Sequence, residues 1–92
     1  MPTNSVTIVN NTGREIRHVY FSPTNEENWG SDQLNNFVIA AGGTREVNSS
    51  CSAGDIKVIA ENQDGCFFYQ VVSCGSNVSW TIASDASADC GN

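Results

Sequence analysis

The chain has 92 residues, which leaves room for one domain with a small hydrophobic core. Ten acidic residues face four basic ones and leave a net charge of -6 at pH 7, which makes nucleic acids and anionic membranes poor partners. No stretch approaches the roughly 20 apolar residues of a membrane-spanning helix.

Short runs of β-branched and aromatic residues recur between clusters of Asn, Gly, Ser and Asp, while helical periodicity is nearly absent. This pattern is typical of an all-β sandwich or barrel. We expect about seven strands, at 5–9, 15–21, 37–40, 44–48, 55–61, 66–73 and 78–82. The predicted fold is an antiparallel β-sandwich, immunoglobulin-like or jelly-roll-like, which occupies 1–92 as a single domain.

Alternation assigns the faces of these strands, because successive side chains of a strand point to opposite sides. The strand at 15–21 shows no clear apolar side, so its register stays open, and a β-bulge would reconcile its two candidate faces. In the last three strands we expect the core to contain Ile56, Val58 and Ala60, then Phe67, Tyr69 and Val71, and finally Val78, Trp80 and Ile82. We interpret Trp80 as a core residue rather than as a ligand platform.

The four cysteines indicate a disulfide framework. An even number of cysteines in a short chain is typical of proteins that are stapled by disulfides. A zinc site is the competing interpretation, but the chain has no C-x-x-C sequence and His18 is its only histidine.

The expected strand order pairs the cysteines. If the strands on either side of the turn at 62–65 form a hairpin, the cysteine before the first strand meets the cysteine after the second. If the next strand turns back to complete a three-stranded meander, the tail at 83–92 ends near the start of the middle strand. We therefore predict the pairs Cys51–Cys74 and Cys66–Cys90, each of which stabilises the domain by roughly 2 to 4 kcal/mol.

Two disulfides also indicate an oxidising compartment, so we expect a secreted protein in the extracellular space or the periplasm. The first residues lack the basic and apolar regions of a signal peptide, and we expect a mature secreted chain or a module of a larger secreted protein. Three Asn-x-Ser/Thr sequences, at Asn10, Asn48 and Asn77, match glycosylation sites, and we attribute them to the abundance of Asn and Ser.

The connection at 22–36 is the longest between predicted strands, and long loops are often functional. A carbohydrate site here would use Trp29 as a stacking surface, because exposed aromatic rings beside polar groups suit sugar rings. Tyr20 and Phe21, at the end of the strand that enters the loop, would extend this surface. Hydrogen bonds to sugar hydroxyls would come from Asn28, Asp32 or Asn35.

Two other interpretations of this loop stay open. Calcium prefers hard oxygen ligands, which Glu26, Glu27, Asn28 and Asp32 could supply, although the spacing is not that of an EF-hand. In a structural alternative, Trp29 caps one open end of the sandwich and Asp32 caps a short helical turn that buries Leu34.

Catalysis finds little support in the sequence. His18 is not accompanied by a Gly-x-Ser-x-Gly or H-E-x-x-H pattern, and a domain of this size has little room for the cleft of a carboxylate pair. We expect a protein that is not an enzyme and that requires no cofactor.

A set of short motifs covers most of the chain, from 6 to 80. They are Asn10-Asn11-Thr12-Gly13, Ser22-Pro23, Trp29-Gly30 with Asp32 and Leu34, Cys51, Asp64-Gly65 and Cys74. This combination resembles an uncharacterised family of small exported bacterial all-β proteins with the pattern NNTG…SP…WGxDxL…C…DG…C. The resemblance implies export and supports the Cys51–Cys74 pair, but it implies no activity, and Cys66 and Cys90 lie outside its pattern.

The leading hypothesis is a secreted, non-catalytic module that binds a polysaccharide or glycan, with calcium as an optional aid. The alternative is a protein-interaction or cell-envelope structural domain without a small-molecule ligand. The position of Trp29 distinguishes the two: exposure beside polar groups favours sugar binding, and burial favours the alternative.

Overall fold

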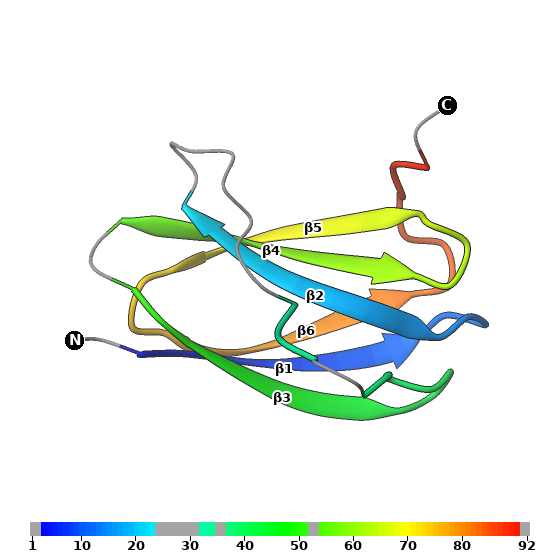
Figure 1. Ribbon diagram of the computed structural model, residues 1–92, viewed down its shortest axis with the longest axis horizontal. Coiled ribbons are helices and arrows are strands. Elements are labelled where there is room, and N and C mark those ends of the chain that lie inside the picture. The colour runs from blue at the N-terminus through cyan, green and yellow to red at the C-terminus, as the bar shows by residue number, and fades with distance from the viewer. Residues whose placement is uncertain (1–2, 24–31, 35–36, 52–53, 91–92) are drawn as a thin grey trace.

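The computed structural model describes residues 3–23, 32–34, 37–51 and 54–90 (Figure 1). In these residues the secondary structure consists of strands and turns, which confirms the all-β class. The strands are β1 (Thr3–Asn11), β2 (Ile16–Pro23), β3 (Thr44–Ser50), β4 (Asp55–Asn62), β5 (Phe67–Ser73) and β6 (Asn77–Ala83). No helix in the described part of the chain is long and apolar enough to cross a membrane.

The strands form two sheets, with the orders β3-β1-β6 and β2-β4-β5 (Figure 1). The second sheet is antiparallel throughout, whereas in the first sheet β1 runs antiparallel to β3 and parallel to β6. One hydrophobic core draws residues from both sheets, among them Val6, Ile8, Val19, Val58, Phe68 and Ile82. The immunoglobulin-like or jelly-roll-like strand order stays a prediction.

The predicted three-stranded meander is wrong, because β6 crosses to the other sheet and pairs with β1. Two hydrogen bonds anchor its start there. The buried Asn4 side chain accepts the N–H of Gly75 through Oδ1 at 2.6 Å, and the Ser5 N–H donates to the Ser76 carbonyl at 3.0 Å. This crossing places the apolar face of β6 over the core, where Ile82 is buried and Trp80 is half-buried.

The predicted strand at 37–40 is not a strand. Only Ile39 pairs, through reciprocal backbone hydrogen bonds of 2.8 and 2.9 Å with Ile16. A tight turn follows at once, in which Gly43 approaches Ala40 so closely that a Cβ would lie 3.0 Å from its carbonyl oxygen. The chain therefore has no room to extend the ladder, and the described residues form six strands rather than seven.

The predicted core face of β5 is also wrong. Phe68 and Val72 are buried, whereas Tyr69 and Val71 are exposed and Phe67 is half-buried on the outer face. The turn before β5 sets this register. Asn62 Oδ1 accepts the N–H groups of Asp64 and Cys66, and Gly65 adopts a positive φ of 79°, so that Phe68 pairs with Ala60. The predicted inner face of β4, formed by Ile56, Val58 and Ala60, is confirmed.

A β-bulge settles the register of β2. The pairing with β4 shifts between Ile16 and His18, as the sequence pattern allows. Ile16, Val19 and Phe21 consequently point into the core. The side chains between them on the outer face are His18 and Tyr20.

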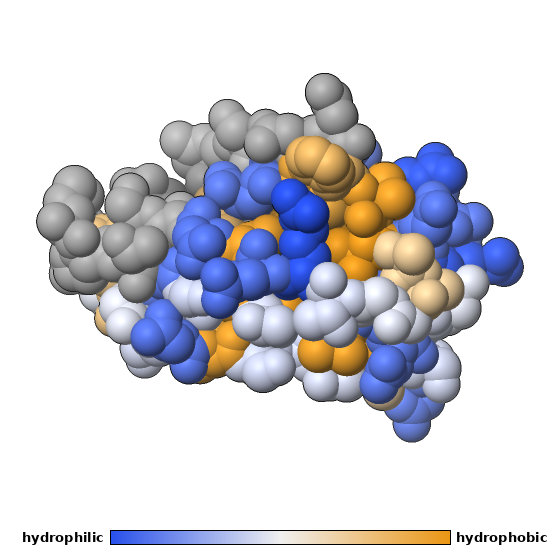
Figure 2. All heavy atoms as spheres, turned by 90° about the horizontal axis from the view of Figure 1, so that it is seen from below, coloured by the Kyte–Doolittle hydropathy of each residue, from blue (hydrophilic) through white to orange (hydrophobic). Residues whose placement is uncertain are grey.

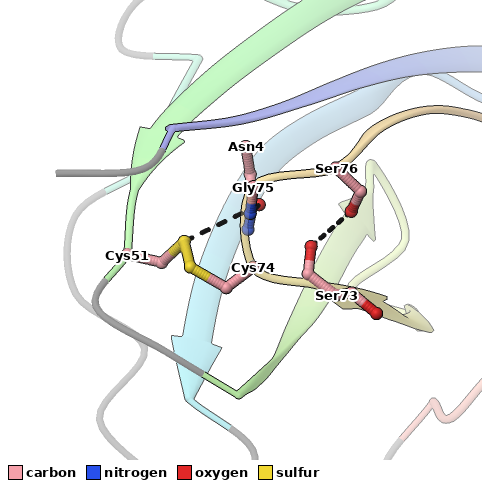
Figure 3. The surroundings of a disulfide bond; sticks show 6 residues. All are labelled: Asn4, Cys51, Ser73, Cys74, Gly75 and Ser76. Atoms are coloured by element: carbon pink, nitrogen blue, oxygen red, sulfur yellow. Dashed lines mark hydrogen bonds between the residues drawn. A yellow bond between two sulfur atoms is a disulfide. The ribbon is translucent and has the colours of Figure 1, made fainter.

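Both predicted disulfides are confirmed, with Cα–Cα distances of 5.9 Å for Cys51–Cys74 and 4.0 Å for Cys66–Cys90. Cys51 is buried in the core cluster, and Figure 3 shows Asn4 beside this bridge. Its Oδ1 lies 3.7 Å from Cys51 Sγ, which is a contact and not a hydrogen bond, because a disulfide sulfur carries no proton. The second bridge is exposed at Cys90 and fastens the tail.

The NNTG motif is a turn built around one buried amide. Asn10 Nδ2 lies 2.7 to 3.2 Å from the carbonyl oxygens of Arg14, Ile39 and Ala40, so two N–H groups serve three acceptors. Its Oδ1 accepts the N–H and the hydroxyl of Thr12. Asn10 is fully buried, and its side chain is not available to a glycosyltransferase in the folded chain.

Candidate binding face

The structure describes two of the predicted ligand-binding residues, Tyr20 and Asp32. Phe21, the predicted extension of the platform, is buried in the core and cannot contribute to it. The other predicted site residues lie outside the described residues; they are Glu26, Glu27, Asn28, Trp29 and Asn35. Within the described part of the chain, no group of three or more His, Cys, Asp or Glu side chains is placed to hold a metal ion.

Asp32 ties the segment at 32–34 to the edge of β2. Its Oδ1 accepts the backbone N–H groups of Val19 at 3.0 Å and Leu34 at 2.9 Å, and its Oδ2 accepts the His18 Nδ1–H at 2.7 Å. Leu34 is fully buried, as the structural alternative for this residue predicts. Both carboxylate oxygens of Asp32 therefore have donors within the chain, and calcium binding is not needed to explain this residue.

The Asp32 carboxylate should make the chain more stable above about pH 4 than below it. Partial burial raises the pKa of Asp32, but two backbone N–H groups, together with the hydrogen bond and the charge of His18, bring its pKa below the ordinary value. A depressed pKa in the folded state means that protonation favours the unfolded chain, so stability falls as the pH drops through the folded-state value.

Urea unfolding at a series of pH values between about 7 and 2 measures this effect. The parent chain should lose stability over the acidic part of the series, and Asp32→Asn should flatten that part of the profile. A profile with the same acidic slope in both proteins would contradict the assignment.

The outer face of the β2-β4-β5 sheet carries a cluster of aromatic and charged side chains, here called the aromatic face. Strand register arranges it in three rows across the sheet, one residue from each strand. The rows are His18–Glu61–Phe67, Tyr20–Ile59–Tyr69 and Ser22–Lys57–Val71. Two tyrosines thus flank Ile59, which is fully buried, in the middle row. They lie two strands and about 10 Å apart at the usual strand spacing.

Ring contacts hold the aromatic side chains in place. His18 stacks on Tyr20 with ring centroids 6.2 Å apart, and Phe67 stacks on Tyr69 at 6.5 Å. Lys57 Nζ lies 5.3 Å from the centroid of the Tyr69 ring, within the range of a cation–π contact. Tyr69 nevertheless remains 40% exposed, so part of its ring is open to solvent.

Both tyrosine hydroxyls are held in the neutral form. Partial burial, then the charges of Glu61 and Asp32, raise the pKa of Tyr20 above its ordinary value. Partial burial, followed by the charge of Asp89 and a hydrogen bond to it, raises the pKa of Tyr69. Each phenol therefore keeps its proton at neutral pH. The Tyr69 hydroxyl donates its proton to the Asp89 carboxylate, and its oxygen can still accept a hydrogen bond.

The outer face of the other sheet has a different character. Its central row joins Glu46, Thr7 and Ser79, and the next row joins Thr44, Val9 and Thr81. These side chains are mainly polar and include no aromatic ring. The aromatic face is therefore the better candidate for a surface that stacks against a ligand.

A second apolar feature precedes β3. Phe37 and Val38 are 58% and 46% exposed, and the Arg45 guanidinium lies 4.5 Å from the centroid of the Phe37 ring. Viewed from the side of β1 and β3, apolar surface gathers next to a strongly hydrophilic strip (Figure 2). Such mixed surfaces suit contacts with another protein.

Comparison with known proteins adds no assignment: no family model, curated protein or solved structure matches the chain. The resemblance to exported bacterial proteins therefore stays a prediction.

The sequence prediction found Tyr20 but missed most of the aromatic face. The sequence predicts Phe67, Tyr69 and Val71 in the core, because both faces of β5 carry apolar residues. A usable signal was present in β4, where Lys57 and Glu61 flank Ile59 on the face opposite Val58 and Ala60. Charged residues at those positions indicate that this side of β4 is the outer one, and in the structure Lys57 and Glu61 are half-buried there while Ile59 between them is fully buried.

Proposed function

We propose that the chain is a secreted, non-catalytic β-sandwich module that binds carbohydrate on the aromatic face. The observation that carries the proposal is the middle row of this face, in which Tyr20 and Tyr69 flank Ile59. Aromatic rings pack against the apolar C–H faces of sugar rings, and phenol hydroxyls can bond to sugar hydroxyls. Two rings about 10 Å apart would contact an extended chain of sugars at two points.

The charges around the face favour a neutral polysaccharide or glycan. Lys57 and Glu61 place one donor group and one acceptor group beside the tyrosines, which suits hydroxyl groups on either side of a sugar ring. The net charge of -6 would repel a polyanionic polysaccharide. The proposed ligand is therefore an uncharged polysaccharide rather than one rich in uronic acids or sulfates.

Calcium is not included in the proposal. Of the predicted calcium ligands Glu26, Glu27, Asn28 and Asp32, only Asp32 belongs to the described residues, and its oxygens already accept three hydrogen bonds within the chain. Carbohydrate binding through the aromatic face needs no metal ion, so a chelator should leave it unchanged.

Affinity electrophoresis in native gels that contain soluble neutral polysaccharides tests the proposal. The parent chain should be retarded on at least one of them, with or without chelator, and Tyr69→Ala should weaken binding about tenfold through the loss of one stacking ring. Ser79→Ala, on the outer face of the other sheet, is the matched control and should bind like the parent. Trp29→Ala tests the loop that the sequence prediction favoured.

Each outcome decides the proposal. Retardation that Tyr69→Ala reduces and Ser79→Ala preserves supports the aromatic face. Retardation that is lost only in Trp29→Ala would contradict this location of the site, and a parent chain that no polysaccharide retards would contradict carbohydrate binding.

The second candidate function is a protein-interaction or cell-envelope structural domain. The exposed pair of Phe37 and Val38, with Arg45 over the Phe37 ring, is the observation that favours it. Absence of retardation on every polysaccharide would leave this candidate in place.

A further inference from the structure

β5 has an open edge. One side of β5 pairs with β4. On the other side, within the described residues, Phe67 forms a two-bond bridge with Asp89, and the Ser73 carbonyl accepts the Ser76 N–H of the following turn at 3.1 Å. The Cys66 carbonyl and the Cys74 N–H point toward the β4 side, where they bond to Asn62 and Gly54. Because backbone direction alternates along a strand, the N–H and C=O groups of Tyr69, Val71 and Ser73 point away from β4.

This edge lacks the usual protection against pairing. The β5 sequence Phe67–Ser73 has no charge, no proline and no bulge in its pairing with β4. Natural edge strands usually carry at least one of these devices. Val71, at the middle of the open part, is 53% exposed.

The edges on the opposite side are protected. Along β2, the Gln33 N–H donates to the Val19 carbonyl at 2.6 Å, and Ile39 pairs with Ile16. β3 carries Arg45 and Glu46 within its strand. β5 is therefore the edge strand in the described part of the chain that combines large exposed apolar side chains with the absence of charge.

We propose that β5 pairs with β5 of a second copy of this chain, antiparallel and about a two-fold axis at Val71. In this register Val71 lies opposite Val71 of the other copy, with which it can exchange two hydrogen bonds, and Tyr69 lies opposite Ser73. The Ser73 N–H of each copy can donate to the Tyr69 carbonyl of the other, whereas the Ser73 carbonyl keeps its bond to the Ser76 N–H. The second strand ends two positions before Phe67, where the Asp89 bridge already occupies the edge. The result is one continuous sheet that contains β2, β4 and β5 of both copies.

The absence of charge favours a second copy as the occupant. Each chain carries a net charge of -6, but β5 itself carries none, so self-pairing brings no like charges directly opposite each other. An antiparallel pair is also self-complementary, as a two-fold dimer requires. A two-fold axis perpendicular to the sheet keeps both aromatic faces on the same side.

The dimer would extend the binding surface, and this consequence rests on the proposed function. The two Tyr69 side chains would lie on adjacent strands at the centre of the joined sheet, with Tyr20 of each copy toward the outside. One polysaccharide chain could then contact both copies and bind more tightly than to a single aromatic face.

Sedimentation equilibrium of the purified chain over a range of concentrations tests the pairing. The parent should approach the mass of two copies, and Val71→Thr, which keeps a β-branched uncharged side chain, should do the same. Val71→Lys and Val71→Glu each place like charges opposite one another and should weaken the dimer about fivefold or more. An equimolar mixture of these two variants should restore it, which a misfolded variant could not do.

A parent chain that stays monomeric at all concentrations would overturn the proposal. The β5 edge would then be left open, or would pair with a strand of another protein rather than with a second copy. A dimer that both charge variants leave intact would also overturn it. Neither measurement involves a sugar, so failure of the dimer and failure of carbohydrate binding are separate outcomes. A monomer that polysaccharide still retards would refute only the pairing.

Discussion

Replacing Cys51 and Cys74 together by Ala should lower the free energy of unfolding by about 3 to 5 kcal/mol. The bridge closes a loop of 23 residues, and its loss releases chain entropy in the unfolded state. Cys51 also belongs to the core cluster, against which Cys74 packs, so the substitution removes buried sulfur as well. Urea unfolding with linear extrapolation measures the change.

The matched control is the double substitution of Cys66 and Cys90 by Ala. Its bridge spans 24 residues, so the chain-entropy effect is nearly the same, but Cys90 is exposed. We expect a smaller loss, about 2 to 3 kcal/mol. An exposed bridge that contributes more than the buried one would contradict the packing role of Cys51 and Cys74.

Asn10→Ala should lower the free energy of unfolding by about 3 kcal/mol. The substitution removes a fully buried amide and leaves the carbonyl groups of Ile39 and Ala40 without this donor. It also removes the acceptor that orients Thr12 in the turn. In a domain of this size, the loss corresponds to a fall in the melting temperature of more than about 10 °C.

Asn11→Ala is the natural control, because Asn11 is the next residue and its side chain is exposed. It should change the free energy of unfolding by no more than about 0.5 kcal/mol. Equal melting temperatures for the two variants would show that the buried amide does not hold the turn together.

The alternation of apolar and polar residues along a strand predicted the buried face of some strands correctly and of others wrongly. In β4, Ile56, Val58 and Ala60 alternate with Asp55, Lys57 and Glu61 over most of the strand, so the inner face could be predicted. β5 contains apolar residues on both faces, and its orientation depends on the Asn62 turn, whose hydrogen bonds are not visible in a hydropathy pattern. The prediction for β5 was therefore wrong although that for its neighbour was right.

The sequence pattern does not predict which distant strands pair with each other. The parallel contact of β6 with β1 joins residues about 70 positions apart, such as Val6 and Val78, and depends on the Asn4 side chain at the crossing. The disulfide prediction is correct although the predicted meander is wrong, because β6 still runs back toward the start of β5, in the other sheet (Figure 1). The tail therefore reaches Cys66 as expected.

The residues of the candidate site were likewise predicted only in part. Tyr20 was found because it enters the long loop, and Asp32 was found as a capping residue. Tyr69 was missed because the cross-strand row that joins it to Tyr20 through Ile59 exists only after β2, β4 and β5 have paired. A binding face that spans three strands can be recognised from sequence only when their register is known.

The most direct test of the account is to map backbone amide chemical shifts while a neutral oligosaccharide, from the polysaccharide that retards the chain most, is added to isotope-labelled protein. We predict that the largest changes occur at Tyr20, Ile59 and Tyr69, with smaller ones at Lys57 and Glu61. The amides of Thr7 and Ser79, on the outer face of the other sheet, should stay unchanged. Changes confined to that other face, or to the Trp29 indole alone, would contradict the aromatic face as the binding surface.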